Sequence, residues 1–357
     1  MIKPISSGDV QCLPKNQIMR ANILFPLLVS LLFTACQKDS GGGTVPPPPP
    51  PVETMYFPPV GSSEWQTKTP ASLGWNETEL NNLFTYLQSK NTKAFIILKN
   101  GKMVAERYFG TFTADSLWYW ASAGKTLTAM LVGIAQQDGI LNINNKSSVY
   151  LGAGWSSLPA TKEDLITVRH QLTMSTGLDD GVPDNDCTLP SCLVYKADAG
   201  TRWAYHNAPY TILDKVVENA SSTTYNNYFQ QKIRDRIGMN GFWFRGTGYN
   251  NVFYSNPRSM ARFGLLMLNK GKWDQTSILS DSNYFNAQVN TSQNYNLSYG
   301  YLTWLNGKAT HMLPQTQLVF NGNLIPTAPA DLYAALGKND QKVYVVPSQK
   351  LVVIRMG

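Results

Sequence analysis

The stretch "WYWASAGKTLTAML", residues 118–131, places a serine and a lysine three positions apart where an apolar helix begins. The residues that follow repeat apolar side chains at the spacing of one helix face, which predicts a helix with this face in the core. These residues are Leu127, Met130, Leu131 and Ile134. Ser122 therefore lies on the first turn of a buried helix, and Lys125 lies one turn later on the same side.

Two interpretations of Ser122 and Lys125 are open at this point. Serine is favoured at helix starts and lysine is common on exposed helix faces, so the pair can be purely structural. In the catalytic interpretation, the free N–H groups and the dipole of the helix start favour negative charge developing near Ser122. Burial then lowers the pKa of Lys125 toward the range in which its neutral amine takes a proton from the serine hydroxyl.

A second segment brings further polar groups to a helix start. The stretch "WAYHNAPY", residues 203–210, places Tyr205 and Asn207 just before a helix that Pro209 helps to begin. A Tyr-x-Asn loop can present a phenol and an amide to the same site. Two more helix starts lie in "ITVRHQLTMSTGLDD", residues 166–180, before this region, and in "NPRSMARFGLLMLNKGKW", residues 256–273, after it.

The order of the predicted elements indicates one α/β domain. Residues 76–90 predict an amphipathic helix, and residues 93–109 predict a hairpin, because two apolar runs flank Asn100-Gly101. A long, mostly helical middle follows to about residue 290. Strand character returns in "YGYLTWLNG", "QKVYVVP" and "KLVVIRM". A sheet interrupted by a helical insertion is the pattern that this order favours.

Taken together, these segments resemble the serine β-lactamase and penicillin-binding-protein-like superfamily. The resemblance covers residues 75–357 and is strongest to its class C-like esterase and 6-aminohexanoate-dimer-hydrolase branch. It implies an α+β fold in which helices flank an antiparallel sheet, with an all-helical lobe beside it. The active site would then lie between the two lobes.

The resemblance also implies roles for the polar residues. Ser122 would be the acylated nucleophile, Lys125 its proton partner and Tyr205 the shared acid and base, while Asn207 would orient the substrate or Lys125. The expected activity is hydrolysis of an ester or amide bond in a small substrate, and the sequence does not separate esters, amides and β-lactams. The alternative is a non-catalytic penicillin-recognising or glycan-associated surface lipoprotein with a decayed hydrolase core.

The third motif of that superfamily, a basic tripeptide such as Lys-Thr-Gly at a strand edge, is altered here. The corresponding stretch is "LGKNDQKVYVVP". By resemblance, Lys338 takes the basic position and the Gln341 N–H is the oxyanion donor, both binding substrate. Asp340 then stands where the family has glycine, and we expect its carboxylate to shape specificity or repel anionic substrates.

The N-terminal region resembles a bacterial lipoprotein signal. The apolar run "ILFPLLVSLLF" is too short to span a bilayer but suits a signal-peptide core. Arg20 precedes this run and "FTAC" follows it, with Phe33 where leucine is more usual. We therefore expect a signal peptide over residues 1–35, translation from Met19, and a lipid-modified Cys36 as the first mature residue.

The remaining chain divides into a linker and one domain. Residues 36–72 contain Gly and Pro tracts typical of a flexible, lipid-anchored linker, and residues 73–357 form the predicted hydrolase domain. The sheet lobe is expected over about 73–115 and 295–357, and the helical lobe over about 116–294.

The C-terminal stretch "KLVVIRMG" predicts a last strand whose cover is not evident in the sequence. Val352, Ile354 and Met356 alternate with other residues, so one strand face is apolar and needs to be covered. Relatives continue into a helix that covers one face of the sheet. We expect that this helix is missing here and that the apolar face is left bare.

Cysteine usage agrees with an extracytoplasmic location. Cys187 and Cys192 flank a Pro-containing turn in "DCTLPSC" and predict a short-loop disulfide. With Cys36 as lipid site, the chain is expected in the cell envelope, anchored to the outer membrane and either periplasmic or surface-exposed. The membrane partner is then reached through lipid.

Composition excludes some other classes. The formal charge is +7, but Lys and Arg are scattered without a basic run, which argues against nucleic-acid binding. The three histidines, His170, His206 and His311, fit no metal spacing, so we expect no metal and no cofactor. A small-molecule ester or amide is the expected partner, and the oligomeric state is left open.

Overall fold

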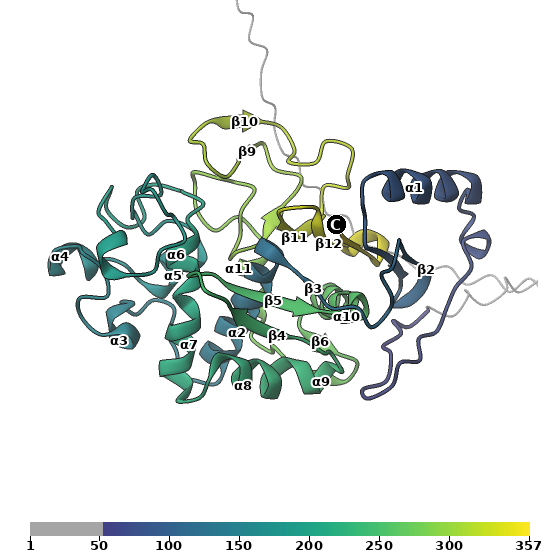
Figure 1. The fold of residues 1–357 in the computed structure, drawn as a ribbon, viewed down its shortest axis with the longest axis horizontal. Helices are drawn as coiled ribbons and strands as arrows, with labels where there is room; N and C mark the ends of the chain where they lie inside the picture. The colour runs from purple at the N-terminus through teal and green to yellow at the C-terminus, as the bar shows by residue number, and fades with distance from the viewer. Residues whose placement is uncertain (1–52) are drawn as a thin grey trace, which may run out of the picture. The chain divides into compact units, whose positions relative to one another are not determined.

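The computed structural model describes residues 53–357 (Figure 1). The predicted signal peptide, Met19 and Cys36 lie outside these described residues. Within residues 53–357, no helix has the length and apolar character needed to cross a membrane. The lipid anchor and the location in the envelope therefore stay predictions.

A six-stranded sheet, antiparallel at every pairing, forms the centre of the fold (Figure 1). The predicted hairpin is confirmed, with Asn100 and Gly101 at φ angles of 52° and 81° in its turn. The last strand lies in the middle of the sheet, beside the first. Across the sheet the strands are β2 (Lys102–Tyr108), β1 (Ala94–Lys99), β13 (Leu351–Met356), β12 (Gln341–Val346), β11 (Tyr333–Gly337) and β8 (Trp304–Leu305).

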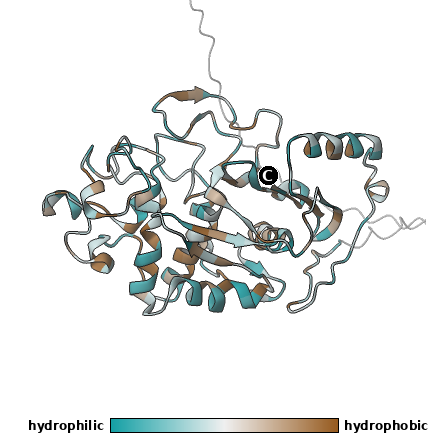
Figure 2. Cartoon of the chain, in the orientation of Figure 1, coloured by the Kyte–Doolittle hydropathy of each residue, from teal (hydrophilic) through white to brown (hydrophobic). Residues whose placement is uncertain are grey.

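Helix α1 (Glu77–Ser89) covers one face of this sheet. The Asn76 side chain caps it by accepting hydrogen bonds from the Thr78 and Glu79 N–H groups. Leu87 of α1 is buried against Phe95 of β1, and the outer side of the helix is largely hydrophilic (Figure 2). The periodicity of residues 76–90 therefore predicted this helix and the burial of Leu87, whereas Leu83, which the same spacing predicts on the buried side, is 36% exposed.

Helix α10 (Pro257–Leu268) covers the other face of the sheet against β12 and β13. It comes close because Gly264 has no side chain: a Cβ there would lie 2.5 Å from Val352 Cγ1. Val352, Ile354 and Met356 are fully buried. The expectation that this apolar face is left bare is therefore wrong, since a helix from the middle of the chain covers it.

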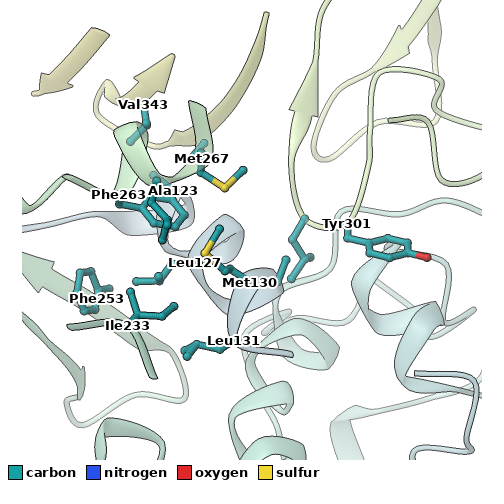
Figure 3. Close-up of a cluster of buried hydrophobic side chains, with 14 of the residues drawn as sticks. Ala123, Leu127, Met130, Leu131, Ile233, Phe253, Phe263, Met267, Tyr301 and Val343 are labelled. Atoms are coloured by element: carbon teal, nitrogen blue, oxygen red, sulfur yellow. The ribbon is translucent and has the colours of Figure 1, made fainter. Parts of the chain in front are cut away.

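Helix α2 (Gly124–Gln137) lies in the core, with every residue from Gly124 to Ala135 buried. Figure 3 shows Leu127, Met130 and Leu131 packed among side chains from other helices and strands. The other α-helices are α3 (Ser148–Leu151), α4 (Ala160–Glu163), α5 (Val168–Leu172), α6 (Asn207–Thr211), α7 (Leu213–Ser221), α8 (Tyr225–Phe229), α9 (Asp235–Ile237) and α11 (Ser282–Gln288). Short 3-10 helices span Ala71–Leu73, Ala121–Ala123, Pro190–Cys192 and Pro347–Gln349, and a π-helical turn spans Gln230–Arg234.

The middle of the chain is not all-helical, contrary to the expectation for residues 116–294. A three-stranded antiparallel sheet runs through it, because two aromatic-rich segments pair across a Gly-containing loop and are joined by a short strand before α2. Its strands are β3 (Trp118–Tyr119), β5 (Asn251–Ser255) and β4 (Phe242–Arg245). Two further hairpins consist of β6 (Lys272–Trp273) with β7 (Thr276–Ser277), and β9 (Thr310–Met312) with β10 (Val319–Asn321).

Residues 53–72, predicted as part of a flexible linker, pack against the domain. The Tyr56 N–H donates to the Asn100 carbonyl at 3.0 Å, and the Met103 N–H donates to the Gln66 carbonyl at 2.9 Å. The physical reason lies in Arg262, a buried cation that needs acceptors. Its guanidinium donates to the carbonyls of Pro58, Pro59, Ser62 and Ile237 at 2.7–3.3 Å.

Candidate functional site

Ser122 lies in the 3-10 helix Ala121–Ala123 that leads directly into α2. Trp120, the residue before this 3-10 helix, is fully buried. It anchors the turn because its backbone N–H and its indole N–H both donate to β5 at 2.8 Å. Ala121 has a φ of 46°, in the left-handed region that costs a non-glycine residue about 1–2 kcal/mol. Strain of this kind, held by a rigid support, is common where a backbone positions a functional side chain.

Lys125 lies one turn after Ser122 and faces it. Its Nζ is 2.9 Å from the Ser122 Oγ, and the residue is only 3% exposed. Burial lowers the pKa of Lys125 to about 7, with the carboxylate of Asp186 acting in the opposite direction. Near neutral pH a substantial fraction of this amine is therefore uncharged and able to take the serine proton.

Two tyrosine rings enclose the Lys125 ammonium group. Its Nζ lies 4.9 Å from the ring centre of Tyr205 and 4.3 Å from that of Tyr210. The Tyr205 ring is stacked on Trp304, with ring centres 5.8 Å apart, which fixes its orientation. Burial raises the pKa of Tyr205 well above its ordinary value, while the neighbouring Ser122 hydroxyl acts in the opposite direction, so its phenol stays protonated at neutral pH.

Asn207 is paired with an acidic residue that the sequence did not single out. Its Nδ2 donates to the Asp186 Oδ1 at 2.7 Å, while α6 begins at Asn207 itself. Asp186 precedes Cys187, which the structure joins to Cys192 in a disulfide. The amide therefore orients a carboxylate near Lys125 instead of contacting Lys125 through a hydrogen bond.

Two cavities, of about 400 and 410 Å³, meet at Ser122. Asn207 and Lys338 border both of them, Tyr205 borders the first, and Lys125 borders the second. Four residues predicted as site residues therefore surround Ser122, as the joint motif order implied.

The third motif borders the site through its first residues only. Gly337, at the end of β11, lies so close to the serine-bearing turn that a Cβ there would sit 2.5 Å from the Trp120 carbonyl and 3.0 Å from the Ala123 nitrogen. Lys338 follows and is exposed at the mouth of both cavities. Gln341, in contrast, pairs with Gly337 from β12 and is fully buried.

This geometry contradicts the roles predicted for Gln341 and Asp340. The Gln341 amide donates to the carbonyls of Asn339 and Gly357, and the residue borders neither cavity, so β11 and not β12 faces Ser122. Asp340 forms ion pairs with Lys342 at 2.8 Å and Arg355 at 2.9 Å. The hydrogen bond from Lys342 lowers the pKa of this carboxyl, and the charge faces these cations and not the cavities, contrary to the expected role in specificity.

The histidines lie apart from this chemistry. His170 caps α5 together with Thr167, and His311 contacts the Gly322 carbonyl through Nδ1 at 3.0 Å. Burial lowers the pKa of His206 to about 4, so its ring is neutral at physiological pH. Within residues 53–357, His, Cys, Asp and Glu do not gather in a group of three that could hold a metal ion.

The family model that describes Beta-lactamase matches residues 88–356, about three quarters of the chain. The chain belongs to the Beta-lactamase family. Ser122, Lys125 and Tyr205 all lie within the matched family region, and so does the strand β11 beside them. A search of curated protein sequences finds no match.

Solved structures show the same fold at low sequence identity. A candidate 6-aminohexanoate-dimer hydrolase from Bacillus anthracis has a TM-score of 0.61 and 19% identity, covering 77% of this chain and 76% of its own. A candidate beta-lactamase from Bacteroides dorei DSM 17855 has a TM-score of 0.62 and 16% identity, with 79% and 90% covered. A class C beta-lactamase mutant has a TM-score of 0.57 and 15% identity, with 78% and 90% covered. The fold is therefore that of the serine β-lactamase and penicillin-binding-protein-like superfamily.

Proposed function

We propose that this member of the Beta-lactamase family is a serine hydrolase that cleaves an ester or amide bond of a small substrate through an acyl-enzyme on Ser122. The observation that carries the proposal is the 2.9 Å approach of the Nζ of Lys125, a residue only 3% exposed, to the Ser122 Oγ. A surface lysine of ordinary pKa cannot act as a base at neutral pH, whereas one with a pKa of about 7 can.

The first half of the reaction follows from these contacts. The neutral Lys125 amine takes the Oγ proton, and the Oγ forms a bond to the substrate carbonyl carbon, whose oxygen becomes negatively charged. The carbonyl then re-forms as the bond to the leaving group breaks. Tyr205 donates its phenol proton to that leaving group and recovers a proton from Lys125, so the first product departs neutral.

The second half of the reaction uses the same groups in the opposite direction. Lys125 is neutral again after passing its proton to Tyr205, so its amine accepts a proton from a water molecule, whose oxygen attacks the acyl carbon. The ester bond to Ser122 breaks, and the serine recovers its proton. Water enters only after the first product has left the cavity.

Steady-state hydrolysis of small esters and amides tests this proposal. Wild-type protein should turn over at least one class, Ser122→Ala should lose this activity, and Ser175→Ala should keep it, because Ser175 is buried against Thr173 and borders neither cavity. Hydrolysis that survives Ser122→Ala would contradict the assignment. Stoichiometric binding of a labelled penicillin without any turnover would favour the non-catalytic surface lipoprotein instead.

We also propose that a lipid on Cys36 holds the mature protein at the cell envelope, on the outer membrane. The sequence "LLFTACQKDSGGG" supports this, and a disulfide in the folded domain suits an oxidising compartment. Globomycin, which blocks lipoprotein signal cleavage, should make a larger precursor accumulate. A mature N-terminus other than Cys36 in purified protein would contradict the anchor, and protease shaving of intact cells separates surface from periplasmic exposure.

A further inference from the structure

The two cavities that meet at Ser122 differ in chemistry. We call the first the leucine cavity, because its walls carry apolar side chains from β8, β11 and the segments after β9 and β10, namely Trp304, Leu313, Pro314, Leu324 and Leu336. We call the second the amide cavity, because its walls carry side-chain amides and phenols, among them Asn250, Asn251, Asn339, Tyr119 and Tyr254. Ser122 lies where an apolar space and a hydrogen-bonding space join.

The leucine cavity has the properties of a site for an apolar group. Trp304 is buried and already fixed by its stacking on Tyr205, and Leu336 is half-buried at the end of β11. Leu313 is 38% exposed at the cavity wall, where water now covers apolar surface that a ligand would bury. A concave apolar surface with few polar groups beside a nucleophile is the usual form of a specificity pocket.

The amide cavity offers hydrogen bonds in place of apolar surface. The Asn339 amide donates to the Tyr119 hydroxyl at 2.7 Å, which holds both groups at the cavity wall. Asp186 borders the same space, and Lys338 borders both this cavity and the leucine cavity. An amide- or hydroxyl-bearing group can exchange its hydrogen bonds with water for bonds to these side chains, whereas an alkyl group cannot.

The positions of the two proton carriers indicate which part of the substrate enters which cavity. The acid that protonates a leaving group must contact it. Of the two cavities, Tyr205 borders only the leucine cavity, and Lys125 borders only the amide cavity. We infer that the substrate is an amphiphilic ester or amide, whose apolar leaving group occupies the leucine cavity and whose polar acyl group occupies the amide cavity. This inference rests on the proposed acyl-enzyme mechanism and goes beyond it by naming the substrate class.

Two ester series of opposite polarity test the inference. The first consists of N-acetylglycine esters of alcohols from methanol to hexanol, and the second of acetyl to hexanoyl esters of N-acetylethanolamine. In the first series kcat/KM should rise roughly two- to fourfold per added methylene, because each enters an apolar cavity, and in the second it should stay flat. A rise in the second series alone, or no dependence in either, would overturn the inference while leaving Ser122 catalysis intact. Absence of all hydrolysis would overturn the proposed function, and the inference with it.

A matched pair of leucine substitutions locates the effect. Leu313→Ser should lower kcat/KM for the hexyl ester about tenfold and for the methyl ester much less, because the variant removes apolar wall that only the longer chain reaches. Leu318→Ser is the control, since Leu318 lies in the same segment, is 65% exposed and borders neither cavity. Equal chain-length dependence in Leu313→Ser and wild type would contradict the assignment of the leucine cavity.

Discussion

The Nζ of Lys125 lies 2.9 Å from the Oγ of Ser122, and it also lies 4.9 Å and 4.3 Å from the ring centres of Tyr205 and Tyr210. The rings of Tyr205 and Tyr210 interact favourably with a cation but form no ion pair, so burial still dominates and lowers the pKa of Lys125 to about 7. The fold thus supplies an amine that changes protonation state at physiological pH.

This pKa predicts a pH profile for the reaction. The rate at low substrate concentration should rise with pH through about 7 and then level off, because only the neutral amine acts as a base. Lys125→Met should lower kcat/KM by roughly 10²–10⁴-fold and abolish this rise. Initial rates between pH 5 and 9, with wild type and variant in the same buffers, check the prediction, and an unchanged profile in the variant would contradict it.

The same pKa predicts how stability depends on pH. Lys125 has its ordinary pKa of 10.5 in the unfolded chain and about 7 in the folded protein, so between these values the unfolded chain binds more protons. This residue therefore contributes a free energy of unfolding that increases with pH across that window. Urea unfolding at pH 6 and pH 9 should show a larger increase for wild type than for Lys125→Met, and equal increases would speak against a buried lysine.

Asp186 is predicted to set the position of the pH profile. Its carboxylate raises the pKa of Lys125 against the effect of burial, so Asp186→Asn should move the rise in activity to lower pH. The amide can still bond Asn207, which keeps the loop in place. Asp164→Asn removes a charge paired with Lys146 outside the site and serves as control. A profile that moves to higher pH in Asp186→Asn would refute this role.

Gly264 is predicted to be required for the contact between α10 and the sheet. Gly264→Ala should destabilise the fold by about 1–3 kcal/mol, because the new Cβ would lie 2.5 Å from Val352 Cγ1 in a packed core. Gly248→Ala is a matched control, since a Cβ there meets nothing within 4 Å. Urea unfolding measures both variants, and equal stability of the two would mean that the α10 contact is not tight.

Local sequence patterns predicted those parts of the fold that depend on neighbouring residues. Asn100-Gly101 determines its own turn, the periodicity of residues 76–90 determines which side of α1 is buried, and alternation in the last two strands determines their faces. The three-stranded sheet was missed because its strands are short and because β3 pairs with β5 across more than a hundred residues of sequence. The cover over Val352 was missed for the same reason, since α10 is distant in sequence.

The candidate site was predictable only where its residues share a local motif. Ser122 and Lys125 are one helical turn apart, and Tyr205 and Asn207 are two residues apart, so these local spacings together with the family resemblance indicated them. Asp186, Tyr210 and Trp304 reach the site through tertiary packing and carry no such signal. The register of the third motif also depends on the sheet, which is why Gln341 was placed at the site and Gly337 was not.

Substitutions of Tyr205 and of its neighbour His206 distinguish the catalytic role of the phenol from any role of the imidazole. Tyr205→Phe should lower kcat by roughly 10²–10⁴-fold while preserving the stacking on Trp304, because only the proton carrier is removed. His206→Gln should cost far less activity, since a ring with a pKa of about 4 is only a weak base and His206 borders neither cavity at Ser122. Thermal melting of both variants checks that the fold is intact, and a larger loss in His206→Gln would exchange the two roles.

Covalent labelling with an active-site probe tests whether Ser122 is the nucleophile that becomes acylated. Protein treated with a fluorophosphonate is digested, and the modified peptide is located by mass spectrometry. We predict one adduct, on Ser122, that forms faster as the pH rises through about 7 and is absent from Ser122→Ala protein. An adduct on any other residue, or labelling that persists in the Ser122→Ala variant, would contradict it.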